Sequence, residues 1–474
     1  MTRANLLIIM SDEHDPMVST PYGHPFVRTP NMQRLADAGA VFANAYCNAP
    51  LCVPSRASFM TGKHLFRTQV WDNASPLGTE EPTWAHRLNA VGYETCLAGK
   101  MHFIGPDQMH GFTHRIMSDI HGMGQISTNL PDWSTGTPAG GRRMRDRLMV
   151  EPGVGDYEHM QYDEEVTRQC LRYLSEPERH DRPWALCASI FTPHFPFIVR
   201  PDYYHYYYPK YADLPLIPAG HLESQHPQIK NLRRYFDCDN VPGEQVRKAR
   251  AAYYGLVEFA DERIGALLDA LEANGLAEDT VVAYVADHGE SLGQHGLWYK
   301  CTFYEPSSRM PLIIRWPGSV RPGSRYTRVT SLLDVVATML DIADADAAFT
   351  DGTSLLPLLT GDAQDGGGMA IAEYEGHGVT TAGRMVRRGP YKLNHYHGER
   401  SELYDLEADP NEFEDLIDKP QHAAMVRQLT DIALDGWDGQ AIYDSVIRSQ
   451  KERMITAKGL EGPWSPPWRH GKYG

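Results

Sequence analysis

The chain opens with a short apolar run that leads directly into acidic residues, Leu6-Leu7-Ile8-Ile9-Met10-Ser11-Asp12-Glu13-His14. A second such run, Val281-Val282-Ala283-Tyr284-Val285-Ala286, ends in Asp287-His288. Continuous apolar runs of this length are typical of buried strands in a parallel sheet. Because ligands of open α/β sheets bind at the carboxyl ends of the strands, we expect Asp12 and Asp287 to meet at that edge, with His288 beside them.

Further apolar runs alternate with stretches of helical periodicity. Strands are expected at Tyr93–Leu97, Trp184–Ile190 and Leu312–Trp316. The clearest helix is expected from Glu244 to Asn274, where apolar residues recur at helical spacing and Gly275 offers a stop. This alternation predicts an α/β fold with a large doubly wound sheet covered by helices on both faces.

A glycine-rich break at Thr360–Gly368 predicts a domain boundary. We expect a catalytic α/β domain at 1–362, a smaller C-terminal α+β domain at 363–440 and a tail at 441–474. The small domain is expected to hold three short strands and one helix, at Met369–Tyr374, Met385–Tyr391, Glu402–Leu406 and Ala423–Leu434. The tail, with its proline- and aromatic-rich end Pro463–His470, is expected to dock on its own domain or on a neighbouring subunit of a homo-oligomer.

The composition excludes some classes of function. The 474 residues carry a formal net charge of −16, which argues against general binding to nucleic acid or anionic membranes. Any anion specificity must therefore come from a local cluster of positive charge. The chain begins without a cleavable signal pattern and has no apolar stretch of membrane length, so we expect a cytoplasmic protein. Seven scattered cysteines fit reduced thiols better than a disulfide frame.

One cysteine lies in a distinctive segment, Leu51-Cys52-Val53-Pro54-Ser55-Arg56-Ala57-Ser58-Phe59-Met60-Thr61-Gly62. This segment predicts a loop that delivers Cys52 to the first turn of a helix. Free amides at a helix start, with Arg56 nearby, favour a thiolate or a bound oxyanion. Taken alone, Cys52 could equally be a small buried core residue.

The string Cys-x-Pro-Ser-Arg-Ala-Ser followed by Thr-Gly resembles the signature of the type I sulfatase family, in which the cysteine is oxidised to Cα-formylglycine. The resemblance implies that Cys52 is a cofactor precursor matured by a formylglycine-generating enzyme. It also implies a mixed sheet of the alkaline phosphatase type and hydrolysis of a sulfate monoester. In the family, one hydroxyl of the formylglycine hydrate attacks sulfur, and the second then expels the sulfate.

The acidic strand ends are candidate metal ligands. Asp12 and Asp287, with His288 as a third ligand, favour a hard divalent ion: calcium first, manganese second, with magnesium possible. Either acidic end alone could simply cap a helix. The resemblance adds Cys52 as a ligand and aligns Glu13 with a position where the family usually has Asp or Gln.

Further basic residues match the family pattern. Gly99-Lys100-Met101-His102-Phe103 resembles its Gly-Lys-x-His motif, which implies that Lys100 contacts the sulfate and that His102 acts on the nucleophile. The segment Thr192-Pro193-His194-Phe195-Pro196 implies that His194 faces the leaving-group oxygen. Lys300 matches a lysine that binds the same oxyanion. Together with Arg56, these lysines would supply the positive field that a sulfate needs.

Several segments look like the choline sulfatase branch of the family, among them Ala49-Pro50-Leu51-Cys52 and Gly296-Leu297-Trp298-Tyr299-Lys300. One region departs from that branch. Where choline sulfatases carry an aromatic cage for the trimethylammonium group, this chain has Gly140-Gly141-Arg142-Arg143-Met144-Arg145-Asp146-Arg147. Arginines do not suit a cation. We therefore expect Arg142, Arg143 and Arg145 to bind a polar, anionic or carbohydrate sulfate, unless the run is a solvated loop.

Three alternatives stay open on the sequence. The first is a choline sulfatase, and the second is a hydrolase of phosphonate monoesters or phosphodiesters that uses the same machinery. The third is a catalytically silent binding protein in which Cys52 is never modified.

Overall fold

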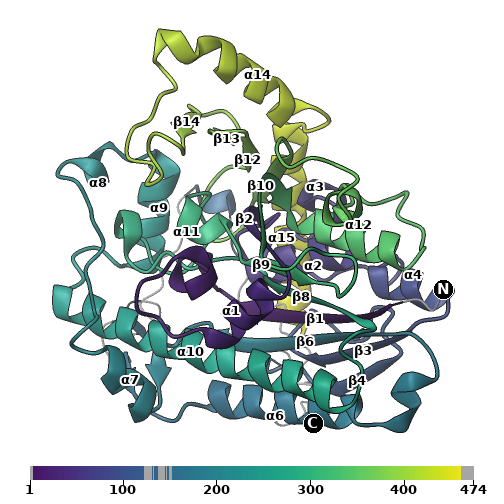
Figure 1. The fold of residues 1–474 in the computed structure, drawn as a ribbon. Coiled ribbons are helices and arrows are strands. Elements are labelled where there is room, and N and C mark those ends of the chain that lie inside the picture. The colour runs from purple at the N-terminus through teal and green to yellow at the C-terminus, as the bar shows by residue number, and fades with distance from the viewer. Residues whose placement is uncertain are drawn as a thin grey trace.

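The computed structural model describes residues 4–121, 131, 133–136, 145, 147–148 and 152–460. Its centre is an eight-stranded sheet in the order β10-β2-β9-β8-β1-β6-β3-β4 (Figure 1). The strands are β1 Asn5–Asp12, β2 Ala40–Tyr46, β3 Glu94–Gly99, β4 His114–Met117, β6 Trp184–Pro193, β8 Thr280–Ala286, β9 Leu312–Arg315 and β10 Ser324–Ser331. β9 runs antiparallel to both β2 and β8, while the other pairs are parallel, so the sheet is mixed.

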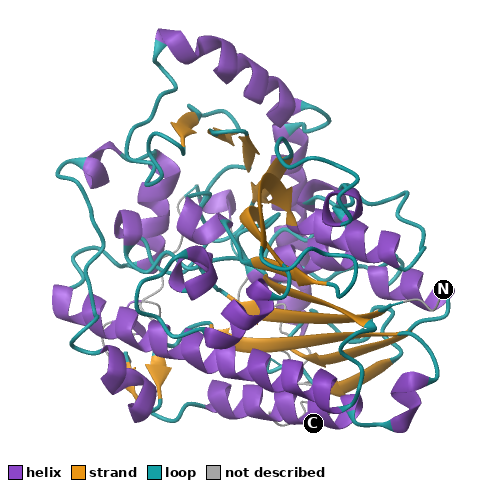
Figure 2. Cartoon of the chain, in the orientation of Figure 1, coloured by secondary structure: helices purple, strands orange, loops and turns teal. Residues whose placement is uncertain are grey.

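Helices cover both faces of this sheet (Figure 2). One face carries α1 (Pro30–Asp37), α6 (Glu158–Leu174) and α10 (Gly243–Ala273), and α7 (Pro201–Tyr207) packs on α10. The other face carries α2 (Cys52–Thr61), α4 (Trp84–Ala90) and α12 (Leu332–Ile342). The further elements are α3 Leu65–Thr68, α8 His221–Ser224, α9 Pro227–Phe236, α11 Glu305–Ser308, α13 Leu356–Leu359, and the two-stranded sheet of β5 Gly153–Val154 with β7 Ile198–Val199. The expected doubly wound α/β architecture is confirmed.

The long helix expected near Glu244–Asn274 is α10. Its apolar stripe, which includes Leu256, Phe259 and Leu267, is buried against the sheet and α6. Gly275 follows the helix with φ 67°, a left-handed conformation that glycine adopts without strain. Within the described part of the chain, neither this helix nor another has the length and apolarity to cross a membrane.

A four-stranded antiparallel sheet forms the smaller C-terminal layer, with α14 (Ala423–Leu434) packed on it. Its strands are β11 Met369–Tyr374, β12 Gly383–Arg388, β13 Tyr391–Tyr396 and β14 Glu402–Asp405. The single strand expected at Met385–Tyr391 is therefore wrong. Gly389 has φ 56° and Pro390 follows it, so a tight turn ends β12 there and starts β13.

The chain then continues as α15 (Gly439–Leu460), which returns to the large sheet's side of the molecule. Both terminal nitrogens of Arg453 donate to the Asp72 carboxylate, at 2.6 and 2.7 Å. The backbone N–H of Trp133 donates to Oε1 of Gln450 at 2.9 Å. The expected domain limits stay predictions, and the one at 440/441 falls within the first turn of α15. The segment Pro463–His470 lies outside the described residues.

Candidate active site

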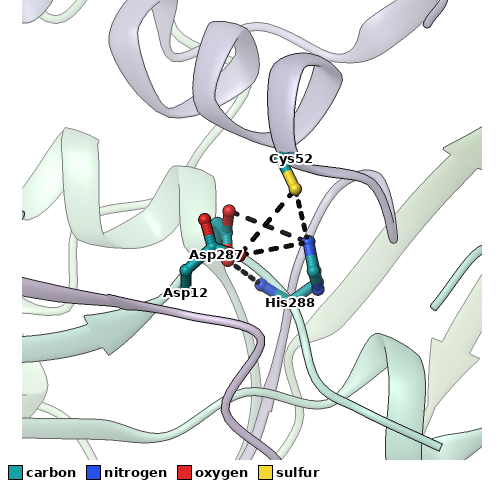
Figure 3. A group of neighbouring side chains, drawn as sticks. All are labelled: Asp12, Cys52, Asp287 and His288. Carbon is teal, nitrogen blue, oxygen red and sulfur yellow. Dashed lines mark hydrogen bonds and ion pairs between the residues drawn. The ribbon is translucent and has the colours of Figure 1, made fainter. Parts of the chain in front are cut away.

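The carboxyl ends of β8, β1, β6 and β3 lie side by side at one edge of the sheet. Asp12 ends β1, Asp287 and His288 follow β8, and Cys52 begins α2 after β2. One ligand atom from each of these four residues lies within 4.8 Å of the other three, and all four are buried (Figure 3). The structure thus brings Asp12, Asp287 and His288 together, as the strand ends predict, and it places Cys52 beside them, as the family resemblance implies.

The geometry of this group suits a divalent cation. Sγ of Cys52 lies 3.3 Å from Nε2 of His288 and 3.8 Å from Oδ1 of Asp12. Nδ1 of His288 lies 3.0 Å from the carbonyl oxygen of Gly289, so Nδ1 carries the hydrogen and the Nε2 lone pair faces the group. Two carboxylates, a correctly oriented imidazole and residue 52 form a donor set that a hard or borderline cation accepts.

The Arg56 guanidinium pairs with both carboxylates, Asp12 and Asp287. Its Nε donates to Oδ2 of Asp287 at 2.8 Å, and its Nη2 donates to Oδ2 of Asp12 at 2.9 Å. Its Nη1 donates to the carbonyl of Lys100 at 2.6 Å. We expected Arg56 to add to the positive field for the oxyanion. This side chain is 1% exposed and pairs with both carboxylates, so its contribution to the oxyanion field stays a prediction.

The environment of Cys52 does not favour a thiolate. Burial, together with the nearby Asp12 carboxylate, raises the pKa of the thiol to about 12 despite Lys100 and Lys300. Burial therefore outweighs any support that the helix start and Arg56 give to a thiolate, while the other expectation, a bound oxyanion, stays a prediction. An unmodified Cys52 is protonated near neutral pH and is a weak nucleophile.

A sharp turn delivers Lys100 to the site. Gly99 has φ 96°, and a Cβ there would lie 2.1 Å from the carbonyl oxygen of Ser189, so only glycine fits. Lys100 pairs with the Asp12 carboxylate, and its Nζ lies 4.5 Å from the centre of the Phe191 ring. The side chain therefore lies next to the candidate metal group rather than in solvent.

Asp119 holds His102 in a left-handed backbone conformation with φ 58°. Oδ2 of Asp119 accepts the backbone N–H of Met101 at 2.8 Å and that of His102 at 2.5 Å. Burial, with His121 and Lys100 nearby, holds the pKa of His102 well below its usual value, so its imidazole is neutral. A neutral imidazole can accept a proton.

His194 and Lys300 form a second basic pair. Nδ1 of His194 lies 2.5 Å from the carbonyl oxygen of Phe195, and its Nε2 lies 2.9 Å from Nζ of Lys300. Burial and the Lys300 ammonium hold the pKa of His194 well below its usual value. Oε2 of Glu13 lies 2.8 Å from Nζ of Lys300 and 3.2 Å from Nε2 of His194. Glu13 therefore contacts this pair, and with Asp12 and His194 it forms a second compact group of potential ligands.

The arginine segment is described only in part. Arg142 and Arg143 lie outside the described residues. Nη1 of Arg145 donates to Asp237, at 3.1 Å to the carbonyl and 3.3 Å to Oδ1. The guanidinium of Arg147 stands 5.0 Å from the centre of the Phe195 ring, which lies next to His194. Arg147 therefore contacts a ring that packs directly on His194.

Three residues near the site could not be identified from the sequence motifs. The His121 ring lies 4.4 Å from that of His102, and the His159 ring lies 4.0 Å from that of Phe191. Asp119, His121 and His159 belong to none of the motifs above. Each comes from a loop or a helix start that the fold carries to the same edge, so short motifs could not have found them.

The fold and the acidic carboxyl edge can now be compared with known proteins. Residues 4–345 match the family model described as Sulfatase, and residues 293–435 match the C-terminal model of N-sulphoglucosamine sulphohydrolase. The first match spans well over half of the chain. The chain therefore belongs to the sulfatase family and is an enzyme of the sulfuric ester hydrolase class.

Individual proteins agree with this assignment. The chain is 34% identical to a choline-sulfatase of Rhizobium meliloti, with 99% of this chain and 93% of that protein covered. It is 26% identical to an N-acetylglucosamine-6-O-sulfatase of Bacteroides thetaiotaomicron, with 90% and 85% covered. The fold matches that of a phosphonate monoester hydrolase of Agrobacterium radiobacter with a TM-score of 0.76, at 24% identity and with 91% and 95% covered.

Proposed function

We propose that the protein hydrolyses a sulfate monoester to an alcohol and inorganic sulfate, with residue 52 as formylglycine and a divalent metal as cofactors. The observation that carries this proposal is the convergence of Cys52 with Asp12, Asp287 and His288 at the buried carboxyl edge. The metal would be held by Asp12, residue 52, Asp287 and His288, with Glu13 next to this group. Calcium is the first candidate, and manganese and magnesium follow. A formylglycine hydrate would supply the nucleophile, and the cation would supply charge that stabilises the reacting oxygens.

The surrounding residues have separate tasks in this proposal. Lys100, paired with Asp12 beside the metal group, would bind a sulfate oxygen. His102 is neutral and held by Asp119, so it would accept a proton from the nucleophile. Arg56 acts through the carboxylates it joins, since it keeps Asp12 and Asp287 in place for the cation.

His194 and Lys300 would serve the leaving group together. His194 is neutral, and its Nε2 lies 2.9 Å from the Lys300 ammonium. A proton for the departing oxygen would therefore come from this pair, with Lys300 as the charged partner that also attracts the sulfate.

The role of His194 predicts a dependence on the leaving group. His194→Ala should slow alkyl sulfates by about 10²–10⁴-fold but nitrophenyl sulfate by much less, because nitrophenolate leaves without a proton. The measurement is kcat/KM across a series of sulfate esters that differ in the acidity of the alcohol. Equal losses across the series would assign His194 to binding instead.

The contact between Asp119 and His102 predicts a positioning effect. Asp119→Asn keeps one oxygen but places an NH₂ group against backbone donors, so it should lower kcat by about 10–100-fold with little change in KM. Thermal unfolding gives the stability cost separately. If the folded variant keeps wild-type kcat, His102 does not depend on this support.

A second candidate reaction is hydrolysis of phosphonate monoesters or phosphodiesters. Its support is the shared fold with a phosphonate monoester hydrolase. Parallel rates on nitrophenyl sulfate and a nitrophenyl phenylphosphonate distinguish the two reactions, and we expect the sulfate to be faster. For the alcohol half, we propose a polar or anionic molecule, including sulfated carbohydrates, rather than choline.

Three further proposals concern the cellular setting. A formylglycine-generating enzyme would convert Cys52, the protein would act in the cytoplasm, and it would form a homo-oligomer.

Coexpression with a formylglycine-generating enzyme should raise the specific activity in proportion to the converted fraction. No conversion of Cys52 and no hydrolysis of any sulfate ester would support the silent alternative, whereas activity that is independent of the converted fraction would contradict the formylglycine nucleophile.

A further inference from the structure

Three aromatic rings form a continuous wall around the leaving-group side of the site. The ring of His194 lies 4.5 Å from that of Phe191 and 4.1 Å from that of Phe195. All three side chains are buried, and they follow one another at the end of β6. In the proposed reaction, an alcohol that leaves past His194 would contact these rings.

Two basic side chains flank the wall from different elements. Arg147 stands 5.0 Å from the centre of the Phe195 ring. His159, from the first turn of α6, lies 4.0 Å from the Phe191 ring and is close enough to Arg147 to feel its charge. Both are partly buried. They thus lie one ring beyond His194, where the part of the alcohol farther from sulfur would lie.

Two lysines also lie along this wall. Nζ of Lys300 lies 4.7 Å from the Phe195 ring and Nζ of Lys100 lies 4.5 Å from the Phe191 ring, so each phenylalanine has a lysine nearby. These two lysines are paired with the side chains of Glu13 and Asp12, which leaves the Arg147 guanidinium as the cation that can act on the alcohol half. Burial, His121, Lys100 and Arg147 together lower the pKa of His159 to about 2, which keeps its imidazole neutral.

Resting on the proposed function, we infer that Arg147 and His159 form a subsite for a carboxylate or second sulfate on the alcohol half of the substrate. A guanidinium carries five N–H donors in a planar fork, so Arg147 can keep a contact within the protein and still bind an anion. The neutral imidazole of His159 can donate or accept one further hydrogen bond. The same positive charge repels a trimethylammonium group, so this subsite selects against choline sulfate.

The test uses pairs of substrates that differ only in charge. Choline sulfate is compared with neohexyl sulfate, its neutral carbon isostere. The compound para-carboxyphenyl sulfate is compared with para-carbamoylphenyl sulfate. The wild type should prefer neohexyl over choline sulfate and the carboxylate over the amide, each by about tenfold or more in kcat/KM.

Variants then assign this preference to Arg147. Arg147→Gln should reduce both preferences to within about threefold, and Arg147→Lys should restore part of them because it keeps the charge. Arg168→Gln is the control, since it removes the same charge from a side chain of α6 that is 73% exposed. A preference for choline sulfate in the wild type, or equal losses for both members of each pair in Arg147→Gln, would overturn the inference.

Binding measurements test the proposed subsite separately from the proposed reaction. In Cys52→Ala, calorimetry with para-carboxyphenyl sulfate and para-carbamoylphenyl sulfate measures recognition without turnover. We expect tighter binding of the carboxylate, and loss of that difference when Arg147→Gln is added. If the wild type hydrolysed no sulfate ester but kept this difference, the proposed reaction would fail and the subsite would stand. Equal binding of the two compounds would reject the subsite even in an active sulfatase.

Discussion

Cys52→Ala is expected to lower kcat by at least about 10⁴-fold on every sulfate ester, because it removes the atom from which the nucleophile is made. The fold should persist. Residue 52 begins α2, and the neighbouring helix residues are all buried, so the helix does not depend on one sulfur atom. The measurement is single-turnover kinetics on purified protein, with circular dichroism melting to establish that the variant is folded.

Cys47 offers a matched control for this substitution. It is also fully buried, it directly follows β2, and its backbone N–H donates to the carbonyl of Ser308 at 2.9 Å. Cys47→Ala should keep activity within a few-fold of the wild type. Substantial hydrolysis by purified Cys52→Ala would remove the nucleophile assignment altogether.

Asp287→Asn is expected to lower kcat/KM by about 10³-fold or more. Asp287 accepts the backbone N–H of Glu13 at 3.1 Å and the Nε–H of Arg56 at 2.8 Å. Its carboxylate is therefore a candidate metal ligand that also fixes the positions of Glu13 and Arg56. Loss of its charge weakens the cation site and leaves Arg56 with a single carboxylate partner. A chelator should cause a similar loss in the wild type, and added Ca²⁺ or Mn²⁺ should reverse it.

A readout other than activity accompanies this test. The metal should raise the melting temperature of the wild type, because a ligand that binds only the folded state stabilises it. It should have little effect on Asp287→Asn. Asp261→Asn is the control, since Asp261 is a buried carboxylate that instead accepts the N–H groups of α1 at Asn31 and Met32. Full activity in metal-free wild-type protein would contradict the metal assignment.

The sequence predicts this site well where the fold follows from continuous apolar runs. β1 and β8 are such runs, and they are neighbours in the sheet, so the residues at their carboxyl ends must converge. β2 and β10 escaped prediction for a physical reason. β2 mixes alanine, asparagine and aromatic residues, and β10 is an edge strand whose burial alternates over most of its length. Neither contains the run of large apolar residues by which β1, β6, β8 and β9 were found.

The partners of a side chain were harder to predict from the sequence than its position in the fold. Arg56 lies where the helix start predicts, but which partner it takes depends on how close α2 lies to two strand ends. Asp119 and His159 reach the site through a loop and a helix start whose paths no local pattern encodes. A motif fixes the residues that a whole family shares, whereas such supporting contacts depend on loops.

The proposed reaction requires that residue 52 is a formylglycine in the active enzyme. Mass spectrometry of the tryptic peptide Leu35–Arg56, from protein coexpressed with a formylglycine-generating enzyme, tests it directly. This peptide also contains Cys47, which serves as an internal control for non-specific oxidation. We predict that the sulfur of Cys52 is replaced by an aldehyde oxygen, that Cys47 stays a thiol, and that specific activity rises with the converted fraction. A fully active enzyme whose peptide retains both thiols would contradict the account.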